Sequence, residues 1–469
     1  MNPKLPFTLL LQLIGFCVFD TAAQVRPVAG IPIPQLAALD TAMQDIMQAN
    51  DIGAGVLAVM KDDTVVYRRA FGWQNEERNI PLRPDSVMRV ASVTKPFTAA
   101  AIRHLVSSGA ISLDSRVFSG RNPESGILDY NAFGTRDVRL TDITINHLLQ
   151  HQGGWNRDAP GIPDHTYQEL QIADEMGIAS PPSRVNIVRW IMGKPLQFDP
   201  GTDTAYANIG FLLLGLIVEE TSGESLFDYL HDNVLVPIGI TPHQILYGRS
   251  FKPDQDAREP HYDAGGSTAA NVFFPASSSD PLVERPYGSW NHQARIGQGA
   301  IVADPFAILA YLAEHQVAGG NIGGPRPAPG NWKWSHTGAL WGTDSLARQR
   351  GDGINYTVIF NKRPQSGTSY ALQMRATLDG IIESGAIASW PRVDVRLQQV
   401  PLPGIEIDID PVAIRLLSTA GRHYRLMKST NLYDWIPAAP PLIGDDTELA
   451  FVIPAENADL MYYRVEIRQ

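Results

Sequence analysis

The chain has 469 residues, of which 44% are hydrophobic and 19% are charged. This composition supports large buried cores and excludes a globally disordered chain, and the length suggests two to three domains. Asp and Glu number 49 against 38 Lys and Arg, and the resulting net charge of −11 disfavours a nucleic-acid binder. The single cysteine, Cys17, excludes a disulfide scaffold and a cysteine metal cluster.

Residues 1–23 have the layout of a secretory signal peptide. One cation, Lys4, precedes an apolar run from Leu5 to Phe19, and small residues follow up to Ala23. The run is shorter than the roughly 20 residues that a membrane-spanning helix needs, although a membrane anchor is the alternative. We therefore expect cleavage near Ala23 and a secreted or periplasmic protein of bacterial type.

Residues 24–390 mix strand and helix patterns. Apolar, β-branched runs at 54–60 and 64–67 predict one hairpin, and the runs on either side of 351–353 predict another. Strands at both ends with helices between them predict an α+β fold, in which helices pack on one antiparallel sheet. Helical spacing is found at 35–48 and, between the hairpins, at about 93–108, 143–150, 184–193 and 209–221.

The first motif that carries chemistry is Ser92-Val-Thr-Lys95, at the start of a predicted helix that ends at Gly109. Pro96 fits there because the first turn of a helix tolerates proline. Residues three apart lie on one face of a helix, so the amine can reach the hydroxyl. A partly buried lysine has a lowered pKa and can activate a serine nucleophile. The alternative is an N-capping serine beside a surface lysine.

The second motif is Tyr206-Ala-Asn208, just before an apolar helical stretch. In an extended backbone, residues two apart face the same side, so the phenol and the amide would point together into a cleft. A phenol can exchange protons with a reacting group, and an amide both donates and accepts hydrogen bonds. Alternatively, Asn208 caps the next helix and Tyr206 packs in the core.

The third motif is His336-Thr337-Gly338. A glycine within a strand permits close approach of a substrate to the backbone. The next N–H group, on Ala339, could then bind a developing oxyanion together with the N–H of Ser92. An ordinary strand with a solvent-facing histidine is the alternative.

From about residue 391 the pattern changes to short, β-rich runs separated by Gly, Pro, Asn and Asp. This predicts a small all-β module over 391–469, with Pro401 to Gly404 as a linker or its edge. The module is weakly similar to C-terminal β-sandwich appendages of secreted bacterial proteins. Tyr424 and Trp435 are interpreted as core aromatics rather than a carbohydrate platform.

The three motifs together, in this order, resemble the serine β-lactamase and penicillin-binding-protein superfamily. The Tyr-Ala-Asn form resembles its class C branch, with the related D-alanyl-D-alanine carboxypeptidases, D-amino-acid amidases and family VIII esterases. The resemblance covers roughly residues 31–385 and implies an antiparallel sheet with flanking helices and a helical subdomain. Further segments similar to that family are 147–154, 199–217 and 297–304.

The resemblance implies a secreted serine hydrolase that works through an acyl-enzyme. Ser92 would be the nucleophile, Lys95 and Tyr206 would share the proton transfers, and the Ser92 and Ala339 N–H groups would bind the oxyanion. The residues expected to bind or position the substrate are Asn208, His336, Thr337, Gly338 and, by its place after Gly153-Gly154-Trp155, Asp158. No metal ion or organic cofactor is needed for this chemistry.

The third motif departs from the family in one place, because His336 stands where related lactamases and carboxypeptidases mostly carry lysine. A histidine is mostly neutral at pH 7, so it gives no permanent partner for a substrate carboxylate. This favours a carboxylesterase acting on a small ester. A D,D-peptidase, a D-amino-acid amidase or a weak β-lactamase, acting on an amide or peptide, is the alternative.

Other classes of protein fit the sequence less well. No G-x-S-x-G sequence is present, which argues against an α/β-hydrolase. His147 and His151 are four apart, but H-E-x-x-H is absent, so we interpret both as structural rather than as zinc ligands. A non-catalytic binding protein, whose C-terminal module contacts a cell surface or polysaccharide, stays open as an alternative.

Overall fold

The computed structural model describes residues 26–120, 126–159, 164–274, 282–392 and 394–395, and strand segments between 405 and 468. The chain divides into two compact units, one of residues up to 63 and 67–390, the other of 391–469 together with 64–66. The segments interpreted as a signal peptide and as a linker, and also Trp435, lie outside the described residues.

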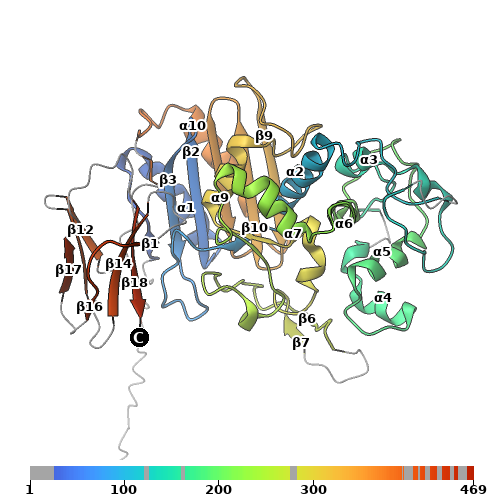
Figure 1. Ribbon diagram of the computed structural model, residues 1–469, viewed down its shortest axis with the longest axis horizontal. Helices are drawn as coiled ribbons and strands as arrows, with labels where there is room; N and C mark the ends of the chain where they lie inside the picture. Colours follow the sequence, from blue (N-terminus) through green and yellow to red (C-terminus); the bar gives the residue numbers. More distant parts are fainter. Residues whose placement is uncertain are drawn as a thin grey trace, which may run out of the picture. The chain divides into compact units, whose positions relative to one another are not determined.

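A six-stranded antiparallel sheet is the centre of the first unit (Figure 1). Its order is β1-β3-β2-β11-β10-β9, so strands from the two ends of the unit meet where β2 pairs with β11. Both predicted hairpins are present, as β2–β3 and β10–β11. The strands are β1 (Val28–Ala29), β2 (Ala54–Lys61), β3 (Thr64–Gly72), β9 (Lys333–Leu340), β10 (Thr343–Arg350) and β11 (Ile354–Phe360).

Helices cover both faces of this sheet. Every residue of β10 and of β11 is buried, which requires a packed layer on each side. Helices α1 and α10 pack together against β2, β10 and β11, and α9 packs against the same strands. These helices are α1 (Ala37–Ala49), α9 (Pro305–Glu314) and α10 (Tyr370–Glu383).

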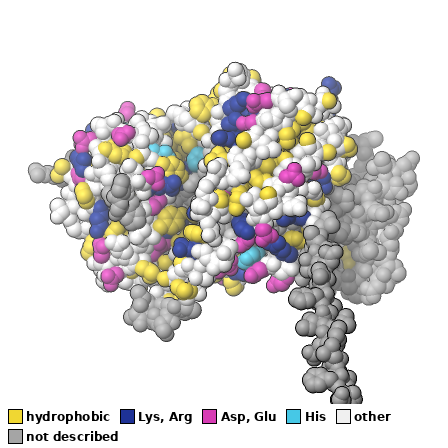
Figure 2. Space-filling model, turned by 180° about the vertical axis from the view of Figure 1, so that it is seen from behind, with side chains coloured by type: hydrophobic (Ala, Val, Ile, Leu, Met, Phe, Trp, Pro, Cys, Tyr) yellow, Lys and Arg dark blue, Asp and Glu magenta, His cyan; other side chains and the backbone are white. Residues whose placement is uncertain are grey.

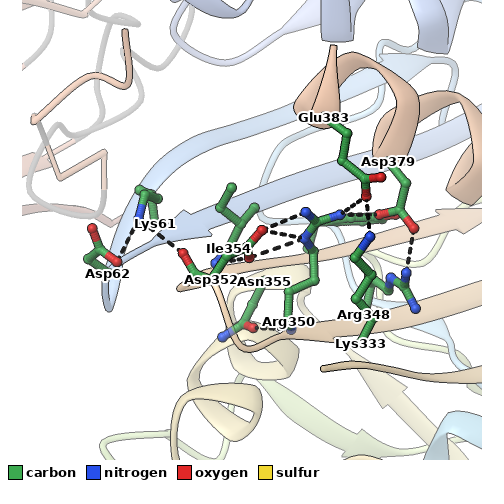
Figure 3. A network of polar contacts seen from close by, with 11 residues as sticks. Lys61, Asp62, Lys333, Arg348, Arg350, Asp352, Ile354, Asn355, Asp379 and Glu383 are labelled. Carbon is green, nitrogen blue, oxygen red and sulfur yellow. Dashed lines mark hydrogen bonds and ion pairs between the residues drawn. The ribbon is translucent and has the colours of Figure 1, made fainter. Parts of the chain in front are cut away.

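An ion-pair network joins α10 to one end of β10 (Figure 3). The Arg350 guanidinium donates to Asp379 and Glu383, both at 2.8 Å, and also to Asp352 in the adjoining turn. Arg348 pairs with the other oxygen of Asp379. The charge of each guanidinium is thus met by carboxylates, and the helix is held in register with the strand.

The segment between the two sets of strands forms a helical lobe (Figure 1). Its central helix, α6, is buried from Asn208 to Val218 and packs against α2, α3 and α8. Gly223 ends α6 in the left-handed conformation, with φ of 76°, which favours glycine. The helices are α2 (Thr94–Ser107), α3 (Ile145–Leu149), α4 (Glu169–Met176), α5 (Arg184–Met192), α6 (Asn208–Ser222), α7 (Leu226–Leu230) and α8 (Ile296–Gly299).

Two small sheets complete the first unit. One has the order β4-β8-β5, and its strand β4 leads directly into the turn that carries Ser92. The other is the pair β6–β7. The strands are β4 (Met88–Arg89), β5 (Ile245–Tyr247), β6 (Thr268–Ala270), β7 (Leu282–Glu284) and β8 (Ile301–Ala303).

The second unit consists of short antiparallel strands in two sheets, as the β-rich pattern predicts. One sheet has the order β12-β13-β17, and in the other β14 pairs with β15, β16 and β18. Tyr424, Leu426 and Phe451 are buried together, so Tyr424 is a core aromatic. The strands are β12 (Ile405–Ile409), β13 (Val412–Leu417), β14 (His423–Ser429), β15 (Ile436–Pro437), β16 (Leu442–Ile443), β17 (Glu448–Val452) and β18 (Tyr462–Arg468).

Across the described residues, no helix combines the length and apolar character needed to cross a membrane. In the same residues, no group of three or more His, Cys, Asp or Glu side chains is placed to hold a metal ion.

Candidate active site

Ser92 lies in a single 3-10 turn, Ala91–Val93, between β4 and α2. Ala91 has a φ of 48°, in the left-handed region that a non-glycine residue rarely occupies. This sharp turn sends the chain from the strand directly into the helix and presents the Ser92 side chain at the helix N-terminus. The positive end of the helix dipole therefore faces any charge that develops on its hydroxyl.

The Lys95 amine lies one turn further on and is fully buried. Its Nζ is 2.8 Å from Asn208 Oδ1, 2.8 Å from the Gln298 carbonyl oxygen and 3.0 Å from Ser92 Oγ. The first two oxygens can only accept hydrogen bonds. A neutral amine has two N–H groups for them and one lone pair, which then faces the Ser92 hydroxyl.

Burial lowers the pKa of Lys95 well below its usual value, and the nearby Arg157 guanidinium lowers it further. Asp164 acts in the opposite direction and raises it. None of the three hydrogen-bonding partners of the amine carries a negative charge, so little compensates for the loss of solvation. The lowered pKa favours the neutral amine, which can accept the proton of Ser92.

The Tyr206 hydroxyl reaches Ser92 from the other side and donates to Ser92 Oγ at 2.8 Å. Burial raises the pKa of Tyr206 to about 12, while the Ser92 hydrogen bond and Arg157 act against this rise. The phenol is thus protonated at neutral pH and fits a proton donor. Its ring packs at a tilt against His151, with 4.5 Å between the ring centroids. Burial lowers the pKa of His151 to about 3, so that neighbour is neutral.

Asn208 faces the same side as Tyr206 because Ala207 between them is extended, with φ of −139° and ψ of 124°. Asn208 does not cap the helix; it is the first residue of α6 and its side chain is buried. Its Nδ2 donates to Asp164 Oδ2 at 2.5 Å, while its Oδ1 accepts from Lys95. Asp164 therefore fixes which way the amide points, because a carboxylate can only accept from the NH₂ group.

Strand β9 lies against the backbone of Ser92. A Cβ on Gly338 would come 2.1 Å from the Val90 carbonyl oxygen and 2.9 Å from the Ser92 nitrogen, so a larger residue does not fit there. Leu340 and Thr343 pair with each other on either side of a two-residue turn. Because hydrogen-bonded and non-hydrogen-bonded pairs alternate in an antiparallel ladder, the next pair, Ala339 and Asp344, exchanges no backbone hydrogen bonds. The Ala339 N–H is then free to face the open edge of the sheet beside Ser92.

His336 lies on the same strand, and its Nδ1 is 3.0 Å from the Thr337 carbonyl oxygen. A carbonyl can only accept, so Nδ1 carries the proton and Nε2 holds a lone pair. Burial lowers the pKa of His336 to about 4, and Lys95 in its protonated form lowers it further. At neutral pH the side chain has no positive charge to offer a carboxylate.

The structure does not bring Asp158 into this cluster. Its side chain is 74% exposed and contacts Arg157 at 3.5 Å. Arg157 is the residue from this loop that reaches the site, with its guanidinium carbon 4.3 Å from the centre of the Tyr206 ring. The sequence analysis missed Arg157, Asp164 and the Gln298 carbonyl. Arg157 has a signal because the same Gly-Gly-Trp segment precedes it, and Gln298 lies in the family-like segment 297–304; Asp164 has no such signal.

The site lies where the helical lobe meets the sheet. Figure 2 shows this side of the first unit hollowed between the two, with histidine and charged side chains along the walls. A serine–lysine–tyrosine cluster with a buried amine and two backbone N–H groups on one side can form and break an acyl bond without a metal ion. These features define a serine hydrolase site of the acyl-enzyme class.

Comparison with known proteins agrees with this class. The Beta-lactamase family profile matches residues 39–343, well over half of the chain. The chain therefore belongs to the beta-lactamase family of serine hydrolases, and the family predicted from the three motifs is confirmed.

Among curated proteins, the chain is 31% identical to esterase EstB of Burkholderia gladioli over 225 residues, which are 47% of this chain and 54% of EstB. It is 27% identical to penicillin-binding protein 4* of Bacillus subtilis over 229 residues, 48% of this chain and 44% of that protein. The chain thus spans about half the length of the curated relatives that it matches.

Solved structures share the fold. The octameric penicillin-binding protein homologue from Pyrococcus abyssi aligns with a TM-score of 0.53 and 20% identity, over 92% of this chain and 100% of that one. The D-amino acid amidase of Ochrobactrum anthropi SV3 aligns with a TM-score of 0.53 and 18% identity, over 74% of this chain and 98% of that one. The predicted α+β fold is confirmed.

Proposed function

We propose that the protein is a carboxylesterase that hydrolyses small esters through an acyl-enzyme on Ser92. The observation that carries the proposal is the arrangement of Ser92 Oγ, which lies 3.0 Å from the Lys95 amine and 2.8 Å from the Tyr206 hydroxyl. The likeness to esterase EstB supports the same class of substrate.

The acylation step follows from these contacts. Lys95, whose pKa is lowered by burial, takes the Ser92 proton in its neutral form as Oγ bonds to the ester carbonyl carbon. The Ser92 and Ala339 N–H groups bind the resulting oxyanion. As the oxyanion collapses, the bond to the leaving alcohol breaks, and Tyr206 gives its proton to the alcohol oxygen. The proton held by Lys95 then restores the Tyr206 hydroxyl.

Deacylation repeats the sequence with water in place of serine. A water molecule gives one proton to the Lys95–Tyr206 pair while its oxygen bonds to the acyl carbon. The bond to Ser92 Oγ then breaks, the proton returns to Ser92, and the carboxylic acid leaves. Each proton that is removed is returned, so the cluster needs no external acid, base or cofactor.

The preference for an ester over a β-lactam rests on His336. Penicillins and cephalosporins carry a carboxylate, and a neutral imidazole with a free lone pair offers it no cation. A charge-assisted hydrogen bond contributes about 1.5–3 kcal/mol, and its absence removes a large part of the recognition of such substrates. A D-amino-acid amidase, a D,D-peptidase or a weak β-lactamase is the alternative that the experiment separates.

A fluorophosphonate probe and a hydrolysis panel test the proposal together. We expect the probe to label wild type, and we expect p-nitrophenyl butyrate to be hydrolysed faster than a chromogenic cephalosporin or D-amino-acid p-nitroanilides. Ser92→Ala should abolish labelling and turnover. Ser107→Ala is the matched control, because Ser107 lies on the same helix and is exposed. Labelling that persists in Ser92→Ala would contradict the assignment.

Export is part of the proposal and is supported by the pattern of residues 1–23. Expression of the full chain in a bacterial host, followed by N-terminal sequencing of the protein recovered outside the cytoplasm, should find a start close to Gln24. An uncleaved chain in the cytoplasm would contradict it. The role of the second unit in contacting a surface or polysaccharide stays a prediction of the sequence.

A further inference from the structure

Two guanidinium groups converge on one indole ring beside the proposed nucleophile. Trp341 is the first residue of the two-residue turn between β9 and β10. The guanidinium carbons of Arg285 and Arg363 lie 4.6 and 4.8 Å from the centre of its ring. Trp341 packs against the cluster that contains Ala91, the residue before Ser92. Trp341 therefore lies near the turn that carries Ser92, and the two guanidiniums lie on its ring.

These two arginines lack the carboxylate partners that other arginines of this unit have. Among the described residues, neither guanidinium has a carboxylate within ion-pair distance; Arg285 Nε donates to the neutral Ser267 hydroxyl at 2.8 Å. Both side chains are half-buried. Burial lowers the pKa of Arg363, and the like charge of Arg285 lowers it further. Asp344 and Tyr167 act in the opposite direction and raise it. A bound anion would relieve this repulsion.

The pair lies at the opposite end of β9 from the groups proposed to act on the leaving alcohol. His336 is five residues before Trp341, and Gly338, which touches Ser92, lies between them. Tyr206 is at the His336 end, because its ring packs against His151 and His336 is close enough to lower the pKa of His151. A leaving group protonated by Tyr206 points towards that end, so the acyl chain points towards Trp341.

We propose that Arg285, Trp341 and Arg363 form a subsite for an anionic group at the far end of the substrate's acyl chain. The subsite rests on the proposed function, since an acyl chain is present only if Ser92 is acylated. Its guanidiniums bind a terminal carboxylate, and the indole lines the methylenes that lead to it. The substrate class is then the monoesters of dicarboxylic acids.

The distance along β9 from Ala339 to Trp341 sets the expected length of the acyl chain. Trp341 is two residues beyond the N–H of Ala339, a distance of roughly 7 Å at the usual rise of a strand. The six-carbon acyl chain of adipate spans about the same length, since C–C bonds are about 1.5 Å long. Mono-p-nitrophenyl adipate and p-nitrophenyl hexanoate have the same number of acyl carbons and differ by the terminal carboxylate alone.

The measurement is the ratio of kcat/KM for adipate to that for hexanoate. Wild type should favour adipate, and Arg285→Gln or Arg363→Gln should each lower the ratio about tenfold while turnover of hexanoate is retained. Arg249→Gln is the matched control, because Arg249 is exposed and stacks on Tyr247 away from Ser92. That variant should leave the ratio unchanged.

A third substrate tests whether the carboxylate is recognised on the acyl side or on the leaving-group side of the ester. The ester of hexanoic acid with 4-hydroxybenzoate carries its carboxylate on the leaving phenol, and its methyl ester is the neutral reference. Wild type should show no preference between these two. If an arginine variant does not fold, the wild-type adipate ratio at 0.05 and 1 M salt replaces it, because screening should reduce a charge-based preference.

The outcomes separate the two proposals. A lowered adipate ratio in both arginine variants supports the subsite. An equal ratio in wild type and both variants, or a preference for the phenol-side carboxylate, overturns the subsite and leaves the esterase intact. Absence of Ser92 labelling and of turnover with both esters overturns the proposed function, and the subsite with it.

Discussion

Two buried cations of the first unit, Lys95 and Arg350, have opposite surroundings. Arg350 is in contact with three carboxylates, and their hydrogen bonds outweigh the cost of burial and raise its pKa (Figure 3). Lys95 has two neutral oxygens and a hydroxyl as partners, and burial lowers its pKa. Both side chains are inside the same domain, so burial alone does not decide what a cation does.

The difference shows that the groups in contact with a buried cation decide whether its role is structural or chemical. Three carboxylates fix the charge of Arg350, which can then only hold α10 against β10. Neutral acceptors leave Lys95 able to lose its proton, which a general base needs. Among the described residues, Asp164 is the carboxylate whose charge raises the pKa of Lys95, and it also accepts a hydrogen bond from Asn208. The following predictions test this contrast, beginning with the largest effect.

Removal of the Lys95 amine should have the largest effect. Lys95→Met keeps the chain length and should lower kcat/KM for p-nitrophenyl butyrate by about 10³, because the proton acceptor is lost. If Lys95 and Tyr206 act as one unit, the double variant with Tyr206→Phe should be little slower than the slower single variant. Lys194→Met, a surface control, should keep full activity. Strict additivity would contradict the proposed coupling.

Removal of the Arg350 guanidinium should instead cost stability. Its side chain is 3% exposed, and Arg350→Met leaves the facing carboxylates without their cation. We expect the free energy of unfolding to fall by about 3 kcal/mol, measured by urea denaturation, with kcat unchanged for the folded protein. Arg83→Met, which breaks the exposed pair with Asp85, should cost at most about 1 kcal/mol. Equal losses in the two variants would contradict the structural role of the network.

The pH dependence of kcat/KM reports the state of Lys95. The lysine must be neutral to accept a proton, so activity should fall as the pH drops through its lowered pKa. Asp164 raises that pKa, so Asp164→Asn should move the acid limb to lower pH. Arg157 lowers it, so Arg157→Gln should move the limb to higher pH. At neutral pH, kcat/KM of the Asp164→Asn variant should also be about tenfold lower than that of wild type, because Asn208 is misoriented.

The exposed Asp158 gives a matched control for this experiment. Asp158→Asn removes one carboxylate from the neighbourhood of the same loop without touching Asn208, and its acid limb should coincide with that of wild type. An acid limb that shifts equally in Asp158→Asn and Asp164→Asn would show that the net charge of the region, rather than the nearby Asp164 carboxylate, raises the pKa of Lys95.

A cation at position 336 should have the smallest effect, a change of substrate ratio. His336→Lys places an ammonium at the leaving-group end and should raise kcat/KM for a chromogenic cephalosporin, relative to p-nitrophenyl butyrate, by about tenfold at pH 8. His243→Lys, at an exposed position, is the control. An unchanged ratio in His336→Lys would show that this position does not set the class of substrate.

The parts of the site that sequence reasoning reached are those with a local signal. The spacing of Ser92 and Lys95 follows from one helical turn, and Tyr206 faces the same side as Asn208 because the residue between them is extended. Gly338 is recognisable because only glycine allows a strand to approach the nucleophile so closely.

The contacts of the remaining residues have no local signal, even where the segment itself resembles the family. The Gln298 carbonyl accepts from Lys95 and the Asp164 carboxylate accepts from Asn208, and only the tertiary fold brings these segments to the site. The sequence points to the loop after Trp155 but not to the side chain that turns inward, because that depends on packing against Tyr206. The stacking of Arg285 and Arg363 on Trp341 likewise joins three distant segments, which periodicity and spacing do not detect.

The pairing of β2 with β11 has a consequence for how the protein folds. Ala58 is opposite Thr357, so most of the first unit lies between two strands that must meet in the centre of the sheet. Closing so long a loop is slow, because its entropy is lost before the contacts form. We expect the helical lobe to gain structure early and the sheet to close late. Since β9 supplies the Ala339 N–H, recovery of esterase activity during refolding should lag behind recovery of helical circular dichroism.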